Sequence, residues 1–260
     1  MKKGIQVVVI TGAASGIGRA CALRLASKGM YVGLLDLNES EAMKVQSTIE
    51  LNGGKARTIQ CDIAKSHDIQ QANEKIVSKW GKVDVVCANA GIAGRLSPID
   101  SMSEEEWDTT MSVNVKGTFL TVKHAIPYVK KQGGSIIITS SVSGNRMFSQ
   151  AGFAAYSTSK ASQVAFMKMA ALELAKYKIR VNAICPGAIE TNIGESIETS
   201  PNVKKVEIPI TFPEGDQPLE HGPGQPEQVA DLVEFLASNR SSHITGTEIY
   251  IDGGESLLRG

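Results

Sequence analysis

The sequence lacks the features that mark membrane proteins and nucleic-acid-binding proteins. No stretch of its 260 residues offers the roughly 20 uninterrupted apolar residues that a membrane span requires. Its 27 basic and 27 acidic residues give a formal net charge of zero. Because nucleic acids and anionic membrane surfaces attract an excess of positive charge, neither is expected as a partner.

Cysteine and histidine are also scarce. The four cysteines stand far apart, with no C-x-x-C pair and no spacing typical of a small disulfide framework; they are Cys21, Cys61, Cys87 and Cys185. The four histidines are equally scattered, so no metal site is expected. A reduced, cytoplasmic protein is the simplest interpretation of this composition.

Short apolar runs rich in valine and isoleucine alternate with longer stretches of helical periodicity. The predicted strands are Ile5–Thr11, Tyr31–Asp36, Ala56–Cys61, Val83–Ala88, Ser135–Ser140, Lys178–Ile184 and Glu248–Ile251. The predicted helices are Gly16–Lys28, Glu39–Leu51, Ser66–Trp80, Glu104–Lys131, Ala155–Lys176 and Pro226–Ser238. Such alternation predicts a single α/β domain over residues 1–260: a Rossmann-type, doubly wound parallel sheet of about seven strands with helices on both faces.

One region departs from this alternation. Asn192–Gly224 carries five prolines, scattered charges and weak periodicity. A connection this long inside a compact domain is usually functional, so a substrate lid is the preferred interpretation. The alternative is a disordered insertion without a role.

A glycine-rich turn, T-G-A-A-S-G-I-G at Thr11–Gly18, lies between the first predicted strand and the helix that follows. Glycines in such a turn permit a tight bend, a close approach of backbone to a pyrophosphate, and close helix–strand packing. The helix N-terminus adds free N–H groups and a partial positive charge. The turn therefore predicts a dinucleotide site.

Asp36 ends the second predicted strand, about twenty residues beyond the glycines. A carboxylate there can accept both hydroxyls of an adenosine ribose and would repel a 2′-phosphate, which carries about two negative charges. Glu39 and Glu41 add no cation, and neither does Ala14. These residues favour NAD over NADP, although Asp36 could also simply cap a turn.

Tyr156 and Lys160 stand four residues apart in a predicted helix, so they share one helix face. Moving the pKa of a phenol from about 10 to about 7 takes roughly 4 kcal/mol. An ammonium about 4 Å away at an effective dielectric constant of about 20 supplies a similar energy. The pair is therefore a candidate acid/base, although the same spacing also occurs on ordinary solvated helix faces.

Other polar residues are predicted at the same place. Ser140 and Ser141 end the fifth predicted strand, and Asn89–Gly91 follows the fourth, at the carboxyl edge where doubly wound sheets bind ligands. A serine hydroxyl there can donate to a carbonyl oxygen that is becoming an alkoxide. Asn114 lies inside a predicted helix. Asparagine has a low helix propensity, so this residue is either functional or merely tolerated there.

Taken in order, these motifs resemble the short-chain dehydrogenase/reductase family. T-G-x-x-x-G-x-G stands at Thr11–Gly18, N-A-G at Asn89–Gly91 and Y-x-x-x-K at Tyr156–Lys160. Pro186–Gly187 follows the sixth predicted strand, and Ile251–Gly254 resembles the closing strand and turn of the family. The resemblance implies reversible hydride transfer between NAD and a small-molecule secondary alcohol or ketone.

The resemblance also implies individual roles. Tyr156 would be the acid/base, Ser141 would orient the substrate oxygen, and Lys160 would bind the nicotinamide ribose and lower the pKa of the phenol. Asn114 would hold a water molecule in a proton relay. The residues implied to contact NAD are Gly12, Ser15, Gly16, Ile17, Gly18, Asp36, Asp62, Ile63, Asn89, Ala90, Gly91, Tyr156, Lys160, Pro186, Gly187, Ile189 and Thr191. Asp62, for the adenine, and Thr191, for the carboxamide, rest on position alone.

Several alternatives stay open. Ser141 lies farther from Tyr156 than is usual in the family, which leaves Ser143 as a second candidate for the serine. A 3-oxoacyl thioester reductase is an alternative activity, although it usually uses NADP, and a non-catalytic NAD-binding regulator is a third possibility. The resemblance also implies a homotetramer paired through two predicted helices, whose apolar positions could otherwise belong to the core: Met111, Val115, Phe119, Phe166, Met169 and Leu172.

Overall fold

A computed structural model describes residues 4–191, 197–212 and 215–259 of the chain. It contains a seven-stranded, fully parallel sheet in the order β3-β2-β1-β4-β5-β6-β7. The strands are β1 (Val7–Thr11), β2 (Tyr31–Asp36), β3 (Lys55–Gln60), β4 (Val85–Ala88), β5 (Gly134–Thr139), β6 (Ile179–Pro186) and β7 (Glu248–Ile251). The predicted Rossmann-type sheet is confirmed, and the strand order reverses between β1 and β4, which opens a crevice at their carboxyl ends.

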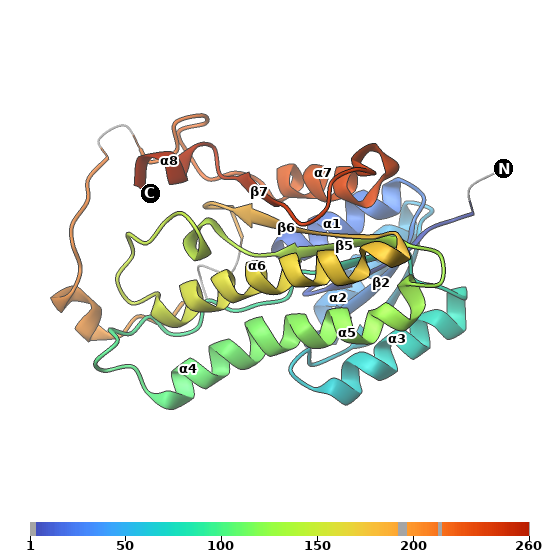
Figure 1. The fold of residues 1–260 in the computed structure, drawn as a ribbon, viewed down its shortest axis with the longest axis horizontal. Helices are drawn as coiled ribbons and strands as arrows, with labels where there is room; N and C mark the ends of the chain where they lie inside the picture. The colour runs from blue at the N-terminus through green and yellow to red at the C-terminus, as the bar shows by residue number, and fades with distance from the viewer. Residues whose placement is uncertain (1–3, 192–196, 213–214, 260) are drawn as a thin grey trace.

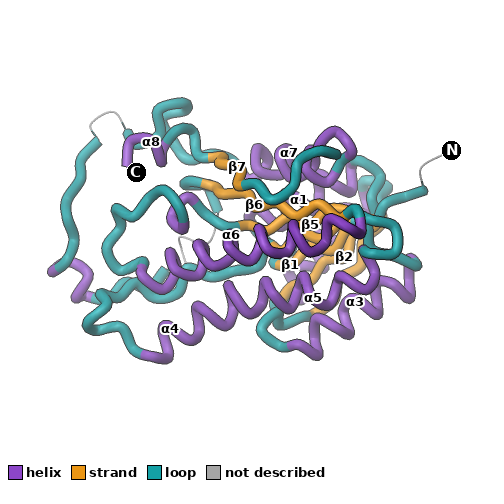
Figure 2. The backbone as a smooth tube through the Cα atoms, viewed as in Figure 1, coloured by secondary structure: helices purple, strands orange, loops and turns teal. Residues whose placement is uncertain are grey.

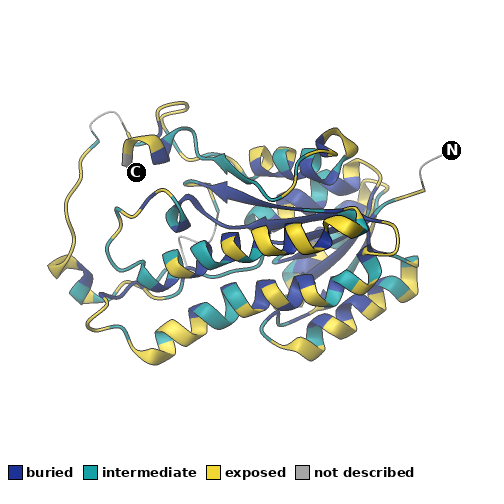
Figure 3. Ribbon diagram, in the orientation of Figure 1, coloured by how far each residue is buried: buried dark blue, intermediate teal, exposed yellow. Residues whose placement is uncertain are grey.

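Helices cover both faces of the sheet (Figures 1 and 2). They are α1 (Gly16–Ser27), α2 (Glu39–Leu51), α3 (Ser66–Trp80), α4 (Glu104–Met111), α5 (Gly117–Val129), α6 (Ala154–Leu174), α7 (Pro226–Ala237) and α8 (Glu255–Arg259). Side chains of α3, α5 and α6 form the core on one face, and side chains of α1, α2 and α7 form the core on the other. Figure 3 shows the strands as the most deeply buried layer between them.

The burial pattern explains why these segments fold as they do. Val8, Ile10 and Leu34 pack toward α1, α2 and α7, while Val7 and Val9 pack toward the opposite helices. Alternate residues of one strand thus enter opposite cores, and each fully buried aliphatic side chain contributes about 1.5–3 kcal/mol. No helix among the described residues is long and apolar enough to cross a membrane.

The helix predicted over Glu104–Lys131 is interrupted. A π-helical turn, η1 (Ser112–Lys116), separates α4 from α5 and contains Asn114. The side chain of Asn114 bonds both backbone groups of Ile92, and its carbonyl accepts side-chain hydrogen bonds. These contacts are made from within the π turn, and π turns of this kind are frequent at functional sites.

The region predicted as a lid, residues 192–224, is described at 197–212 and 215–224; its other positions lie outside the described residues. Its first part is tied to the loop after β4, because Leu96 N donates to the carbonyl of Glu198 (2.9 Å) and Ser200 N donates to the carbonyl of Leu96 (2.8 Å). Residues 204–211 are exposed and form the orange strap at one end of the molecule in Figure 1. The strap is therefore anchored at its base, beside the mouth of the crevice.

Candidate active site

A cavity of about 470 Å³ lies along the carboxyl edge of the sheet. It extends from the glycine turn after β1 and the end of β2 to β5, α6 and the segment after β6. Its walls contain almost all of the residues predicted for coenzyme and catalysis: Gly12, Ser15, Gly16, Ile17, Asp36, Asp62, Ile63, Asn89, Ala90, Gly91, Ser141, Tyr156, Lys160, Pro186, Gly187, Ile189 and Thr191. Residues from the ends of three strands, from α1, η1 and α6, and from the loops between them therefore share one hollow.

Glycines shape the first end of the cavity. Gly12 and Gly16 have positive φ angles of 65° and 48°, a conformation that other residues adopt at a cost. A Cβ on Gly12 would lie 2.9 Å from the Cα of Ala90. A Cβ on Gly18 would overlap the carbonyl of Gly12, which explains why Gly18 packs beneath the turn instead of lining the cavity. The turn thus opens α1 with its first N–H groups facing a ligand space, which suits a pyrophosphate.

Asp36 lies at the same end of the cavity. Its two carboxylate oxygens accept backbone hydrogen bonds from Ala14 N and Asn38 N, both at 2.9 Å. Each oxygen keeps a second acceptor site, so the fixed carboxylate can still accept ribose hydroxyls. Among the described residues that line this hollow and its shallow extension over residues 36–40, Lys160 is the only cation. No other described lining residue offers a positive charge at this end of the cavity.

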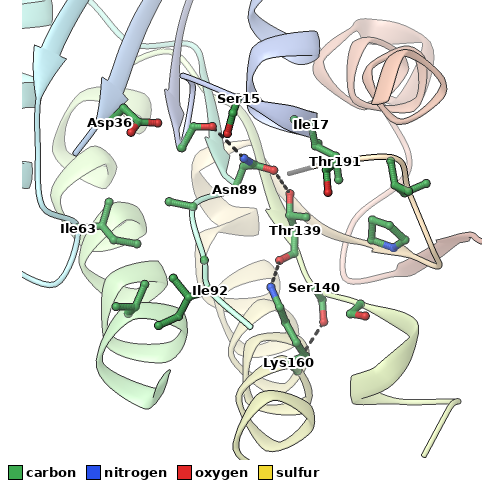
Figure 4. Close-up of a pocket in the computed structure, with 18 of the residues that line it drawn as sticks. Ser15, Ile17, Asp36, Ile63, Asn89, Ile92, Thr139, Ser140, Lys160 and Thr191 are labelled. Carbon is green, nitrogen blue, oxygen red and sulfur yellow. Dashed lines mark hydrogen bonds between the residues drawn. The ribbon is translucent and has the colours of Figure 1, made fainter. Parts of the chain in front are cut away.

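A chain of hydrogen bonds connects the glycine turn to Lys160 (Figure 4). Asn89 Nδ2 donates to the carbonyl oxygens of Thr11 (3.2 Å) and Gly12 (3.4 Å), and Asn89 Oδ1 accepts from the hydroxyl of Thr139 (3.1 Å). The carbonyl of Thr139 in turn accepts from Lys160 Nζ at 3.0 Å. The predicted role of Asn89 is therefore accompanied by a structural one, because it fixes the ends of β1, β4 and β5 relative to one another.

The phenol of Tyr156 and the serine region meet at the second end. Tyr156 lies in the first turn of α6, packs edge-on against Phe153 with ring centroids 5.2 Å apart, and is hydrogen-bonded to Ser141. Lys160 Nζ lies 5.5 Å from the centroid of the Tyr156 ring. Ser141 lines the cavity, whereas Ser143 contributes a backbone N–H that donates to Ser141 Oγ at 3.1 Å. This arrangement favours Ser141 over Ser143.

Burial perturbs both ionisable groups of the pair. Desolvation raises the pKa of Tyr156, and its hydrogen bond with Ser141 opposes that effect. Desolvation lowers the pKa of Lys160 to about 8, with Cys185 acting in the opposite direction. The expected lowering of the phenol pKa by Lys160 is thus not found here, because the apolar surroundings disfavour the charged form of each group. The phenol is protonated at neutral pH.

Asn114 lies one layer behind the cavity. Its Nδ2 donates to Ser159 Oγ (2.9 Å), and Ser159 donates to the carbonyl of Tyr156 (2.7 Å). The Asn114 carbonyl accepts from Thr118 Oγ1 (2.7 Å) and from Gln163 Nε2 (2.9 Å). A carbonyl oxygen has two lone pairs, so these two donors fill the acceptor capacity of the Asn114 carbonyl. The contacts make Asn114 a brace between the loop after β4 and the first turn of α6.

Some residues of this site were not predicted. Gln163 is 1% exposed, and its Oε1 has no hydrogen-bond partner among the described residues, although both hydrogens of its amide are used. Thr139 and Ile92 also line the cavity. Thr139 near the end of a predicted strand and Ile92 directly after the N-A-G motif were usable signals, whereas Gln163 carried none beyond being a polar residue on the buried face of a helix. No group of metal-ligating side chains occurs in the described part of the chain.

Comparison with known proteins gives consistent matches over nearly the whole chain. A family profile described as enoyl-(acyl carrier protein) reductase matches residues 12–256. A 3-ketoacyl-ACP reductase from Sinorhizobium meliloti is 45% identical in sequence; the structural match has a TM-score of 0.93 and covers 97% of this chain and 100% of that one. The 3-oxoacyl-[acyl-carrier-protein] reductase FabG of Thermotoga maritima is 38% identical over 252 residues, 96% of this chain and 97% of that protein. A 3-ketoacyl-(acyl-carrier-protein) reductase from Brucella melitensis, solved with NADH, is 32% identical with a TM-score of 0.85, and the match covers 96% of this chain and 98% of that one.

Proposed function

The chain belongs to the short-chain dehydrogenase/reductase family and is an oxidoreductase, and from that premise we propose an NAD-dependent enzyme that reversibly oxidises a secondary alcohol to a ketone. One observation carries the proposal. Ser141, Tyr156 and Lys160 line the same cavity as Asp36, which stands at the opposite end among residues without a cation. Acid/base groups and a ribose-binding carboxylate thus share one ligand space.

The glycine turn and Asp36 fit the adenosine half of NAD. The turn provides N–H groups for the pyrophosphate, and Asp36 provides acceptors for the ribose hydroxyls. Asp62 adds a second carboxylate to the same part of the cavity. Two carboxylates disfavour the extra charge of a 2′-phosphate, which supports NAD.

Nicotinamide, when bound, supplies the hydride acceptor for oxidation and the hydride donor for reduction. The residues of the chain handle the proton. In reduction, the protonated phenol of Tyr156 donates to the ketone oxygen, and the hydroxyl of Ser141 donates a hydrogen bond to the same oxygen. In oxidation, the phenolate accepts the hydroxyl proton. Because burial raises the pKa of Tyr156, the protonated form that reduction needs is the prevalent one at neutral pH.

Lys160 has two tasks in this proposal. As an ammonium it stabilises the phenolate that forms when Tyr156 gives up its proton, and it supplies donors for the nicotinamide ribose. Lys160 Nζ donates to the carbonyl of Thr139 at 3.0 Å, and this bond orients the ammonium. Asn114 acts through the backbone that carries Tyr156, since its amide reaches the Tyr156 carbonyl by way of Ser159. Thr118 and Gln163 already donate to the Asn114 carbonyl, so a relay water near Asn114 would bind to other groups.

A 3-oxoacyl thioester is a second candidate substrate. It is favoured by the two solved structures and the Thermotoga protein described above, which are named as reductases of acyl-carrier-protein substrates. The Brucella structure contains NADH, so an acyl-carrier-protein reductase name and an NAD-type coenzyme occur together in one relative. The exposed strap at residues 204–211, with Val206, Ile208 and Ile210, is the proposed lid over either substrate.

The proposed assembly is a homotetramer. Of the six apolar positions considered from the sequence, Phe119, Met169 and Leu172 are exposed by 43%, 55% and 73%, and the other three are half-buried. Phe119, Met169 and Leu172 are therefore not core residues of one chain, whereas Phe166 packs against its core. Phe119 and Phe166 form an edge-on pair, with centroids 6.0 Å apart, that joins α5 to α6. Light scattering at micromolar concentration tests this proposal, and a stable monomer would refute it.

The four cysteines fit a cytoplasmic enzyme without a thiol switch. All four are free and buried. Desolvation raises the pKa of Cys21 and of Cys61 to about 12 and that of Cys185 to about 11. Since the thiolate is the reactive form, such thiols are chemically inert at neutral pH.

The experiment that tests the function is a substrate panel read by nicotinamide absorbance. Secondary alcohols, polyols, hydroxysteroids and 3-oxoacyl thioesters are each assayed with both coenzymes. Turnover of an alcohol or a ketone, with a higher kcat/KM for NAD than for NADP, is the expected result. Higher kcat/KM with NADP, or coenzyme binding without turnover of any class in the panel, would contradict the proposal.

A further inference from the structure

The wall of the cavity at the end of β6, residues Pro186–Thr191, has little regular structure beyond Pro186. It is held by bonds to two neighbouring segments. Gly187 N donates to the carbonyl of Ile251 at the end of β7 (3.0 Å), while Glu190 N donates to the carbonyl of Gly224 (2.9 Å). Four of its residues line the cavity shared with Tyr156 and Lys160. The conformation of this wall therefore depends on parts of the chain that do not themselves line the cavity.

A carboxylate from the last helix completes this support. Glu255 begins α8, is 4% exposed, and accepts a hydrogen bond from Ala188 N through Oε2 at 2.9 Å. A Cβ on Gly187 would lie 2.7 Å from the same Oε2, so the approach of the carboxylate requires a glycine there. A buried carboxylate is costly unless it accepts strong hydrogen bonds, and a bond from a backbone N–H to a charged oxygen is among the stronger kinds.

The position of Glu255 is itself fixed. The carboxylate of Asp252 accepts from Gly254 N (3.2 Å) and Ser256 N (3.0 Å), which sets the start of α8 directly after β7. The Asp252 carbonyl also accepts from Glu255 N at 2.9 Å. The backbone of Glu255 is thus fixed by its bond to Asp252, and its side chain contacts the wall at Ala188 N.

We propose that Glu255 is a positioning residue for the coenzyme: its carboxylate holds the Ala188 peptide, and through it the cavity wall at Pro186–Thr191, in the conformation that receives the nicotinamide end. The proposal rests on the function proposed above. It assigns a role in the site to a residue that does not line the cavity and that lies more than sixty residues along the chain from the wall it holds.

Reach and charge can be separated by three substitutions. Glu255→Asp keeps the charge but is one methylene shorter, so the bond to Ala188 N is lost. Glu255→Gln keeps the reach and a carbonyl oxygen as acceptor, and Glu255→Ala removes both. Glu227 is the matched control, because it also stands in the first turn of a helix, α7, but is exposed.

The dissociation constant of NADH, measured by fluorescence titration, is the first readout. Loss of a hydrogen bond to a charged group predicts an increase of about tenfold for Glu255→Asp and Glu255→Ala. Glu255→Gln should stay within about threefold of the wild type, and Glu227→Ala should not change. The KM for the coenzyme should rise with its dissociation constant while kcat changes less, because the acid/base residues are untouched.

Hydrogen exchange of the peptide covering residues 186–191, in the coenzyme-free protein, is the second readout. Faster exchange in Glu255→Asp than in Glu255→Gln is expected. Wild-type affinity and wild-type exchange in Glu255→Asp would overturn the proposal, and so would equal losses in the Asp and Gln variants. If wild-type protein binds no NADH, the proposed function fails while the exchange data still decide whether Glu255 holds the wall. If Glu255→Ala does not fold, the Asp and Gln pair gives the same decision.

Discussion

The two ends of the cavity differ in whether backbone or side chains form them. The adenosine end consists mainly of backbone, with Gly12 and Gly16 in positive-φ conformations and the fixed carboxylate of Asp36. These residues come from one short stretch of chain. The reaction end consists of side chains, and Ser141, Tyr156 and the residues that support them come from β5, η1 and α6. One end is local in sequence and the other is assembled from distant segments.

The two ends also differ in how much they depend on ionisable groups. Backbone groups in the glycine turn carry no titratable charge of their own, and the carboxylate of Asp36 holds the turn at Ala14 N. At the reaction end, desolvation raises the pKa of Tyr156 and lowers that of Lys160 to about 8. A binding surface can therefore be made from conformation alone, whereas an acid/base site requires ionisable groups in surroundings that oppose their ionisation. Substitutions at the two ends should have separable effects on binding and on turnover.

Tyr156→Phe tests the reaction end with the largest expected effect. Loss of the general acid should lower kcat by about 10²–10⁴-fold. The dissociation constant of NADH should stay near the wild-type value, because the glycine turn and Asp36 are unchanged. Steady-state kinetics and fluorescence titration measure the two quantities. A variant that retains more than about a tenth of the wild-type kcat would show that the proton comes from another group.

Asp36→Ser tests the adenosine end. Removing the carboxylate deletes two acceptors for the ribose and the repulsion of a 2′-phosphate, so the ratio of kcat/KM for NAD to that for NADP should fall by about 10–100-fold. The kcat with saturating coenzyme should change little. The control is the coenzyme ratio of Glu41→Ala, which alters an exposed charge on α2, the helix that follows β2. An unchanged ratio in Asp36→Ser would refute the assignment.

The pH profile sharpens the comparison by isolating Lys160. Its pKa is depressed to about 8, so the ammonium is present below that pH and is lost as the pH rises through it. The phenol stays protonated over the same range because its pKa is raised. The kcat/KM for ketone reduction should therefore fall roughly tenfold between pH 7.5 and 9. In Lys160→Met the residual kcat/KM should be low and should not fall over this pH range. If it still falls, the decline belongs to another ionisable group.

Gln163→Leu should give the smallest effect. The substitution removes a donor to the Asn114 carbonyl, but it also removes the buried Oε1 that has no partner among the described residues. These contributions oppose each other, so the free energy of unfolding should change by about 1 kcal/mol or less. A decrease in kcat of a few-fold with unchanged NADH affinity would place Gln163 at the reaction end. Weaker NADH binding with unchanged kcat would contradict that placement.

The fold and the adenosine end could be predicted because their determinants repeat along the sequence. Alternating apolar runs predict the parallel sheet, and Gly12 through Asp36 form a contiguous pattern. The π turn at Asn114 was missed, because it depends on partners 22 and 49 residues away, Ile92 and Gln163. The raised pKa of Tyr156 in the coenzyme-free chain was not predicted, because the estimate from the sequence counted the charges of Lys160 and oxidised nicotinamide and left out the desolvation that the packed structure reveals. Helix α8 is too short for a periodic signal, so Glu255 was missed as well.

The strand order has a further consequence, for the kinetics of folding. Strands β3, β2 and β1 are neighbours that the first 60 residues supply, whereas β1 must wait for β4 on its other edge, where Val7 N bonds Asp84, 77 residues away. Non-local parallel pairing is slow, and the segments of the reaction end are farther still along the chain. A refolding chain should therefore complete the β3-β2-β1 half of the sheet first. Because Asn89 after β4 bonds the glycine turn, coenzyme binding should return only once β4 has joined β1.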